Sequence, residues 1–318
     1  MSTSRDAASD GDRAIPGESS VMPAEPERGG GLATPSFGLP AGASSGLPGP
    51  LGETRIGPRT FAWGTRTFVM GILNVTPDSF SGDGLARDGL ARDGHGSAAR
   101  PPDGAIVDAA VVLARSMVDD GADLLDIGGE STRPGHAEVG VEEEIARVVP
   151  VIEAVRGALP DVPLSIDTTK PRVAAAAIDA GAALVNDVWG VAPDDSLSRL
   201  AAERGVPIVL MHNRAEPRYT ALVPEILGDL ERAIERAVSA GVPFEQILVD
   251  PGFGFGKTAE HNLAVLRDLG ALRLLGRPIL LGTSRKSTLG RVLDLPADQR
   301  VEATVATTVL GIAARIDM

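Results

Sequence analysis

One pattern recurs along most of this sequence: a short apolar run ends on polar or glycine-rich residues, and a stretch of helical character follows. The first example runs from Val69 to Ser81, where an apolar run that carries Asn74 near its end leads into a Thr-Pro-Asp-Ser turn. An apolar run without helical periodicity predicts a buried strand that delivers polar groups to its carboxyl end. Strands that alternate with helices in this way predict an α/β fold with parallel pairing.

Six further segments repeat this pattern. Strands are predicted at residues 123–128, 163–167, 183–188, 207–212, 246–250 and 278–282. Helices are predicted at 105–120, 141–159, from Pro171 onward, near 196–204, and at 224–240, 259–269 and 301–315. Each unit carries its polar cluster at the carboxyl end of a strand, where (β/α)8 barrels build their active sites. We therefore predict a TIM barrel that lacks its last strand and helix. The alternative is a doubly wound open sheet, which normally gathers its ligand groups at one switch point.

The amino-terminal segment differs in composition from the rest. Residues 1–57 are rich in Gly, Pro, Ser, Ala and Glu and have no periodic apolar face that could offset the entropy of ordering them. We predict a disordered tail there and a barrel domain over residues 58–318. Residues 59–67 are expected to form a hairpin around Gly64. The loop at 82–104 contains GLARD twice, which indicates a tandem duplication in a mobile loop.

Composition excludes several classes of function. The 318 residues include no cysteine, so disulfides and thiolate metal sites are ruled out. A formal net charge of -13 with no basic stripe opposes a general affinity for nucleic acid. No apolar run approaches the length of a membrane span, and the first twenty residues lack the apolar core of a signal peptide. We therefore expect a cytoplasmic protein that binds neither membrane nor nucleic acid.

The polar residues at the strand ends form a candidate site. In a barrel, one mouth would receive Asn74, Arg133, Asp167, Asn186, Met211, Asp250 and Lys286. Carboxylates and amides that converge with a lysine suit a flat heterocycle with a donor-donor edge, such as a guanine-like or pterin ring. Any one of these aspartates alone is more easily read as a helix cap or a turn residue. Three units end in Asp or Asn, and it is much less plausible that all of these residues are only helix caps or turn residues.

Two glycine-rich or basic loops were compared with known anion-binding patterns. Residues 252–257 fit neither a P-loop nor the dinucleotide pattern, because Pro251 and Lys257 stand where those patterns need glycine. Small-residue turns around Phe253 and Phe255 instead suit a close backbone wall with aromatic contact to a ring. The segment 284–287 places two cations and two hydroxyls at a helix start, which favours an anion, although a solvated basic turn is equally compatible.

The sequence does not predict a metal site built by the protein alone. The four histidines lie in separate units and show no ligand spacing. A Mg²⁺ ion carried in on phosphate oxygens, with one amide or hydroxyl of the protein as a ligand, stays compatible with the sequence.

Seven motifs in a fixed order carry a family resemblance. They read GILNVTPDSFS, DIGGESTRPG, SIDTTKP, NDV, LMH, DPGFGFGK and GTSRKS, and they resemble those of the dihydropteroate synthase family from about Thr60 to Arg315. The resemblance implies a (β/α)8 barrel that joins 6-hydroxymethyl-7,8-dihydropterin pyrophosphate to p-aminobenzoate and releases pyrophosphate. Such a protein is a transferase of folate biosynthesis.

The same resemblance implies roles for individual residues. The catalytic residues would be Lys286, Asp167, Asp250 and Arg133. The pterin would be held by Asp167, Asn186, Asp250 and Lys286, in a slot shaped by Met211, Phe255 and Gly282. The pyrophosphate and its Mg²⁺ would meet Asn74, and the carboxylate of p-aminobenzoate would meet Ser287. The two loops that close over the second substrate would include Asp78, Phe80, Thr132 and Arg133.

The carboxyl terminus departs from the family pattern. The family continues into a last strand with an Arg-x-His motif and a final helix, whereas here Ile316, Asp317 and Met318 end the sequence. We expect a gap between the seventh and first strands and a weakened homodimer. The alternatives are an inactive truncated pterin binder and a methyltetrahydrofolate-corrinoid methyltransferase; the latter would not call for the STRPG and SRKS loops.

Overall fold

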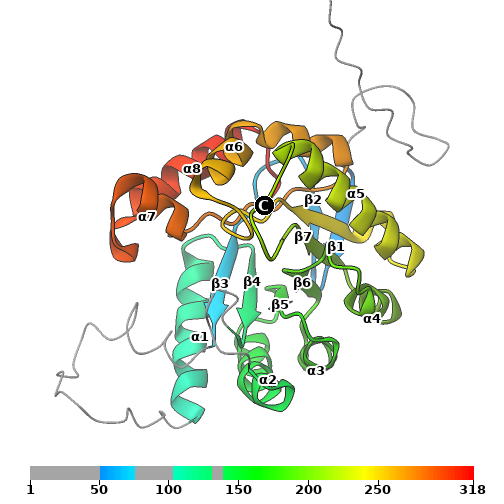
Figure 1. The fold of residues 1–318 in the computed structure, drawn as a ribbon. Helices are drawn as coiled ribbons and strands as arrows, with labels where there is room; N and C mark the ends of the chain where they lie inside the picture. Colours follow the sequence, from blue (N-terminus) through cyan, green and yellow to red (C-terminus); the bar gives the residue numbers. More distant parts are fainter. Residues whose placement is uncertain (1–50, 76–102, 131–138) are drawn as a thin grey trace, which may run out of the picture. The chain divides into compact units, whose positions relative to one another are not determined.

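The computed structural model describes residues 51–75, 103–130 and 139–318. Six parallel strands pair in the order in which they occur in the chain, and the sheet curves with the helices on its outer side (Figure 1). The strands are β3 (Met70–Asn74), β4 (Leu124–Gly128), β5 (Leu164–Asp167), β6 (Leu184–Asp187), β7 (Ile208–Met211) and β8 (Ile247–Asp250). Sequential parallel pairing with crossover helices is barrel topology, so the predicted fold class is confirmed.

Seven of the α-helices follow the strands as the sequence predicts, and an eighth, at residues 287–293, was not among the predicted helices. They are α1 (Asp103–Asp119), α2 (Val141–Ala158), α3 (Pro171–Ala180), α4 (Ser196–Arg204), α5 (Leu222–Ser239), α6 (Ala259–Arg267), α7 (Ser287–Leu293) and α8 (Val301–Ala313), with short 3-10 helices η1 (Phe244–Gln246), η2 (Leu269–Leu275) and η3 (Ala297–Gln299). Pro171 begins α3, where its fixed φ suits the first turn. Gly205 ends α4 in the left-handed conformation. In the described part of the chain, no helix combines the length and the apolar character that a membrane span requires.

The segment 278–282 takes the place of the predicted seventh strand beside β8. Val249 N donates to Pro278 O at 2.9 Å, and Leu280 N donates to Val249 O at 2.8 Å. These bonds form a single parallel bridge between Val249 and Ile279.

The expected gap between the seventh and first strands is bridged at the amino ends of the strands. Phe68 N, just before β3, donates to Asp317 O at 2.9 Å, and Leu281 N donates to Met318 O at 2.9 Å. Asp317 N in turn donates to Ile279 O at 3.0 Å. The last three residues thus pair with both neighbours, and the expectation of an open edge is wrong at this level of the barrel.

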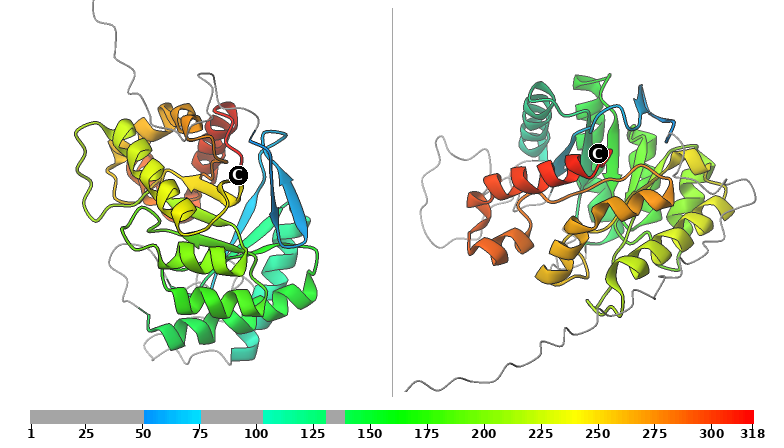
Figure 2. Two further views of the ribbon diagram at one scale, coloured as in Figure 1. Left: turned by 90° about the vertical axis from the view of Figure 1, so that its right-hand side faces the viewer. Right: turned by 90° about the horizontal axis from the view of Figure 1, so that it is seen from above.

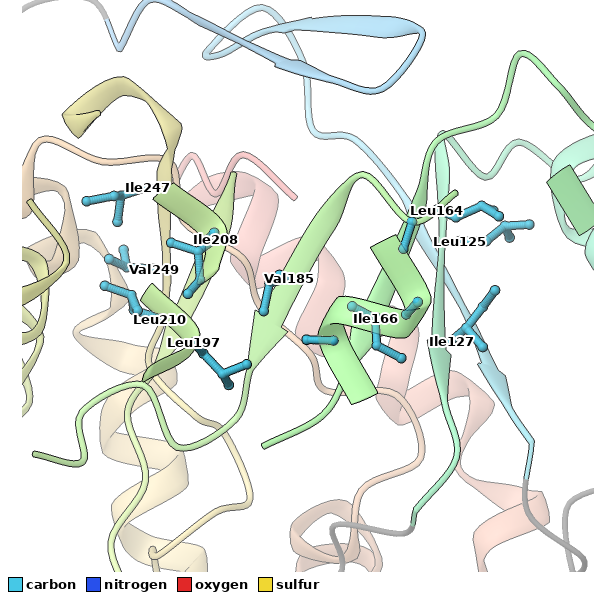
Figure 3. Close-up of a cluster of buried hydrophobic side chains, with 14 of the residues drawn as sticks. Leu125, Ile127, Leu164, Ile166, Val185, Leu197, Ile208, Leu210, Ile247 and Val249 are labelled. Carbon is cyan, nitrogen blue, oxygen red and sulfur yellow. The ribbon is translucent and has the colours of Figure 1, made fainter. Parts of the chain in front are cut away.

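The outer face of the sheet carries the main hydrophobic core. Alternate strand residues point toward the helices and are almost completely buried, as Figure 3 shows for Leu125, Ile127, Leu164, Ile166, Val185, Ile208, Leu210, Ile247 and Val249. Small and branched aliphatic side chains of this kind allow close packing of helices on a parallel sheet. The remaining strand residues therefore point into the barrel.

Inside the barrel, the amino ends of the strands are apolar and closed by an aromatic plug. Leu124, Leu184, Val209, Leu248 and Leu280 form one buried layer with Phe61, Trp63 and Phe68. The ring centroids of Phe61 and Phe68 lie 4.8 Å apart, edge to face. This end of the barrel is packed, so polar chemistry is confined to the opposite end.

The plug is delivered by an antiparallel hairpin of β1 (Glu53–Ile56) and β2 (Arg59–Ala62), visible beside the sheet in Figure 2. Its turn lies at residues 57–58, and Gly57 has φ +54°. A hairpin is present, but it is not the one predicted: of residues 59–67 only 59–62 form a strand, and this strand pairs with residues 53–56 instead of folding back at Gly64. Since β1 begins at Glu53, the tail predicted for residues 1–57 must end earlier; residues 1–50 lie outside the described part.

Candidate active site at the carboxyl ends of the strands

Polar side chains occupy the barrel interior above the apolar layer. The register pairs Asp167 at the end of β5 with Asn186 in β6, and Met211 at the end of β7 with Asp250 at the end of β8. Asn186 and Asp250 are buried, and so is Met211, at 3% exposure. Because these residues share the inward face of neighbouring strands, the structure brings together four of the predicted site residues.

A further aspartate, absent from the residues predicted for the site, belongs to this cluster. Asp126 lies in the middle of β4, opposite Ile72 on one side and Ser165 on the other. Asn186 Nδ2 donates to Asp126 Oδ2 at 3.0 Å. The Asn186 amide, which is predicted to bind a ligand, is therefore oriented by the Asp126 carboxylate, which lies deeper in the barrel.

Burial dominates the electrostatics of these acids. It raises the pKa of Asp126, Asp167 and Asp250, and for Asp167 the neighbouring Asp126 carboxylate raises it further. Within the described residues, Asp167 Oδ1 is buried without a hydrogen-bond partner, whereas the Asp126 carboxylate has Ser165 and Asn186 as hydrogen-bonding neighbours. Buried carboxylate oxygens without partners favour a ligand that donates N–H groups to them.

Lys286 stands over this acidic interior. Its Nζ donates to Phe253 O at 2.6 Å and lies 4.3 Å from the centre of the Phe255 ring. Burial lowers the pKa of Lys286 to about 8, although Asp250 and Asp167 favour its charged form. A methyl group on Gly282 would lie 3.9 Å from this Nζ, so Gly282 borders the same space.

The glycine-rich loop after β8 fixes the position of these groups. Gly252 N donates to Asp250 Oδ1 at 2.6 Å, which orients that carboxylate. Gly254 N donates to the Asn262 side chain of α6 at 2.7 Å, and Gly254 has φ +87°. Phe253 is buried against Leu266 and Leu289, and Phe255 faces Lys286; aromatic contact of this loop with a ligand ring stays a prediction.

Comparison with known proteins agrees with this geometry. The family model described as pterin binding enzyme matches residues 103–318. The dihydropteroate synthase of Clostridium beijerinckii is 49% identical over 258 residues, which cover 81% of this chain and 89% of that protein. The chain belongs to the dihydropteroate synthase family.

Solved structures of dihydropteroate synthases support this assignment. The enzyme from Clostridium difficile, crystallised in the presence of pteroic acid, has a TM-score of 0.71 and 45% identity, and the match covers 81% of this chain and 91% of that one. The Xanthomonas albilineans enzyme with 4-aminobenzoic acid has a TM-score of 0.71 and 41% identity, covering 81% and 88%. As a dihydropteroate synthase, the protein is a transferase of folate biosynthesis.

In this dihydropteroate synthase, β3, the first strand of the barrel sheet, ends in Asn74. Its side chain is exposed. A Cβ atom on Gly128 would lie within 4 Å of both Asn74 Oδ1 and the Asp167 side chain, so these two side chains lie on either side of Gly128. Among the described residues, no three His, Asp or Glu side chains are arranged to hold a metal ion. One amide oxygen suits Mg²⁺ that keeps most of its ligands from water and phosphate, so the donor set fits a substrate-borne ion.

The mouth also carries an exposed tryptophan. Asp187 ends β6 with its side chain on the side opposite Asn186, and its Oδ1 accepts a 2.9 Å hydrogen bond from Trp189 N. Burial raises the pKa of Asp187 to about 6. Trp189 is 40% exposed, in the segment that follows the carboxyl end of β6.

The remaining predicted residues divide into two groups. Ser287 is exposed at the first position of α7, and it lines a cavity of about 510 Å³ together with Arg291 and Arg300. The other predicted residues, Asp78, Phe80, Thr132 and Arg133, lie outside the described part of the chain.

Proposed function

We propose that this dihydropteroate synthase binds the pterin of 6-hydroxymethyl-7,8-dihydropterin pyrophosphate among the interior acids. The supporting observation is the buried Asp167 carboxylate, whose Oδ1 has no hydrogen-bond partner among the described residues and which favours the charged form of Lys286. A pterin edge presents an amino group and a ring N–H that such oxygens accept, while the ammonium of Lys286 donates to the ring carbonyl. The Clostridium difficile relative was crystallised with pteroic acid, a pterin compound.

The second substrate, p-aminobenzoate, is proposed to lie nearer the solvent. Ser287, Arg291 and Arg300 border one cavity along α7 together with Asp294, and the two cations are the groups there that would attract a carboxylate. The Xanthomonas albilineans relative was solved with 4-aminobenzoic acid. The roles of Asp78, Phe80, Thr132 and Arg133 in closing over this substrate stay predictions from the sequence.

The chemistry needs few proton transfers from the protein. Loss of pyrophosphate leaves positive charge on the pterin methylene, and ionised acids near the ring would stabilise that charge. The aromatic amine is then nucleophilic enough to attack without a strong base, and the proton that its nitrogen loses after the C–N bond forms passes to water or to the released pyrophosphate. Mg²⁺ would neutralise the leaving pyrophosphate, and Asn74 is the residue proposed to meet it.

The test is dihydropteroate formation by the purified chain with both substrates and Mg²⁺. We expect Lys286→Ala and Asp250→Ala each to lower turnover at least about 100-fold, the typical loss when one group that stabilises transition-state charge is removed. Asp195→Ala, which removes an exposed ion pair with Arg199, serves as the control and should leave turnover unchanged. Near-normal turnover in both site variants would refute the assignment.

The two alternatives give different results in the same experiment. A chain that folds and binds pterin but forms no dihydropteroate would be an inactive pterin binder. Methyl transfer from methyltetrahydrofolate to a corrinoid would indicate the methyltransferase. The cytoplasmic location, the homodimer and the Mg²⁺ requirement stay predictions.

A further inference from the structure

The use of lysine in this chain is unusually selective. Among 30 lysines and arginines, lysine occurs only at positions 170, 257 and 286, and each of them follows a barrel strand. A lysine ammonium is a compact charge with three tetrahedral donors, whereas the arginine guanidinium is a flat fork. Lys286 belongs to the site described above and Lys170 pairs with glutamates, but no role has yet been assigned to Lys257.

Lys257 is buried below the glycine-rich loop rather than in the mouth. It is 9% exposed, and its Nζ lies 3.1 Å from both Gly252 O and Phe255 O. The third short contact, at 3.0 Å, is with His212 Nδ1. His212 O lies farther away, at 3.4 Å. One ammonium thus ties both ends of the loop to the residue that follows β7, and its three donors point at the three closer acceptors.

The partner histidine is held in one tautomer by its other neighbour. His212 is completely buried, and its Nε2 lies 3.1 Å from Asp229 Oδ2 on α5. Since an ammonium has no acceptor and a carboxylate has no donor, only a neutral imidazole with its proton on Nε2 satisfies both contacts. Burial lowers the pKa of His212 to about 4, which agrees with a neutral ring.

Asp229 is itself fixed by charge. Arg214 donates to its Oδ2 from Nη2 at 2.7 Å, and Arg232 ion-pairs with its Oδ1. A chain of hydrogen bonds therefore connects the Asp229 carboxylate on α5, through His212 and Lys257, to the backbone of the glycine-rich loop. Burial lowers the pKa of Lys257 to about 7, while Asp250 favours its charged form.

We propose that Lys257, oriented by His212, is a positioning residue for the pterin site. It holds the loop so that Phe253 O meets Lys286 Nζ and the Phe255 ring faces the same ammonium. It also fixes Gly252, whose N–H orients Asp250. Lys257 itself touches no substrate. This inference rests on the proposed roles of Lys286 and Asp250.

The test compares variants by their equilibrium affinity for free 6-hydroxymethylpterin and by their kinetic constants for the pterin substrate. Lys257→Met keeps the aliphatic length but removes the donors, and Lys257→Arg keeps the charge but not the tetrahedral geometry. Both should bind the pterin at least tenfold more weakly and raise the pterin KM. Val151→Ala, a cavity variant in α2 away from the loop, controls for lost stability, and it should lower the melting temperature while leaving the pterin affinity within twofold.

Two substitutions of His212 keep the proposal testable if Lys257 variants do not fold. His212→Asn retains an acceptor near the Nδ1 position for Lys257, while His212→Gln reaches toward Asp229 and loses that acceptor. The Asn variant should retain pterin affinity within about threefold, and the Gln variant should weaken it tenfold.

Unchanged affinity and KM in Lys257→Met would overturn the proposal, as would equal or reversed effects of the two His212 variants. These binding results are independent of turnover. If the wild-type chain formed no dihydropteroate, the proposed function would fail, while the pterin affinities would still decide the role of Lys257.

Discussion

Replacing Gly252 with alanine should damage both the stability and the site of this protein. Gly252 has φ +69°, and a Cβ atom built on it would lie 1.8 Å from His212 O. A carbon atom normally stays about 3.3 Å from such an oxygen, so the backbone of the loop or of His212 must move by about 1.5 Å. That movement breaks the bonds of Gly252 with Asp250 and Lys257.

The cost can be compared with a matched control. Gly205, at the end of α4, has φ +64°, but a Cβ there meets no atom within 4 Å. Gly205→Ala should therefore cost only the left-handed strain, about 1–2 kcal/mol of unfolding free energy. Gly252→Ala adds the loss of two hydrogen bonds to charged groups, about 1.5–3 kcal/mol each, for a total of about 4 kcal/mol or more.

Thermal unfolding and turnover measure the two effects separately. At about 2–4 °C per kcal/mol for a domain of this size, the melting temperature should fall by at least about 8 °C in Gly252→Ala and by clearly less in Gly205→Ala. Turnover per folded molecule should fall in the first variant only. Equal melting temperatures together with full activity in Gly252→Ala would show that the loop tolerates the movement and that the argument is wrong.

Two other predictions concern charge. The pKa of Lys286 is lowered to about 8, so its charge is present below that pH and is lost above it. We therefore expect kcat/KM for the pterin substrate to fall as the pH rises through about 8. A pH-rate profile that stays flat to pH 9.5 would contradict this. Lys170→Ala should cost about 3–5 kcal/mol of unfolding free energy in urea, because it leaves Glu144 buried without its cation at 2.7 Å. Arg172→Ala, at the exposed pair with Glu142, should cost less than about 1 kcal/mol, and a similar cost for both would argue against a buried charge.

The sequence predicted those parts of the site that local pattern determines. Asp167 and Asp250 end apolar runs, and strand ends meet at one side of a parallel sheet, so their convergence follows from the fold. Asp126 was missed because it lies inside an apolar run, where only the alternation of strand side chains distinguishes an inward position. Strict attention to that period of two in β4 could have identified it.

Other features depend on contacts that no local pattern encodes. Lys257 and His212 lie 45 residues apart in sequence and meet only because β7 and β8 are neighbours. The hairpin was predicted at residues 59–67 with its turn at Gly64, whereas it pairs residues 53–56 with 59–62 around a Gly-Pro turn at 57–58, because both glycines are turn signals and the sequence does not say which one the strands use. The bridge formed by Ile316 to Met318 likewise depends on backbone groups of distant strands.

The aromatic plug and the exposed mouth give this protein a built-in pair of optical probes. The chain has only two tryptophans. Trp63 is 6% exposed in the plug, and Trp189 is 40% exposed at the opposite end of the strands. Emission from Trp63 should be blue-shifted and should change only when the barrel unfolds, whereas the redder emission of Trp189 should respond to a ligand at the mouth. Spectral resolution of the two would let one unlabelled sample report folding and occupancy at the same time.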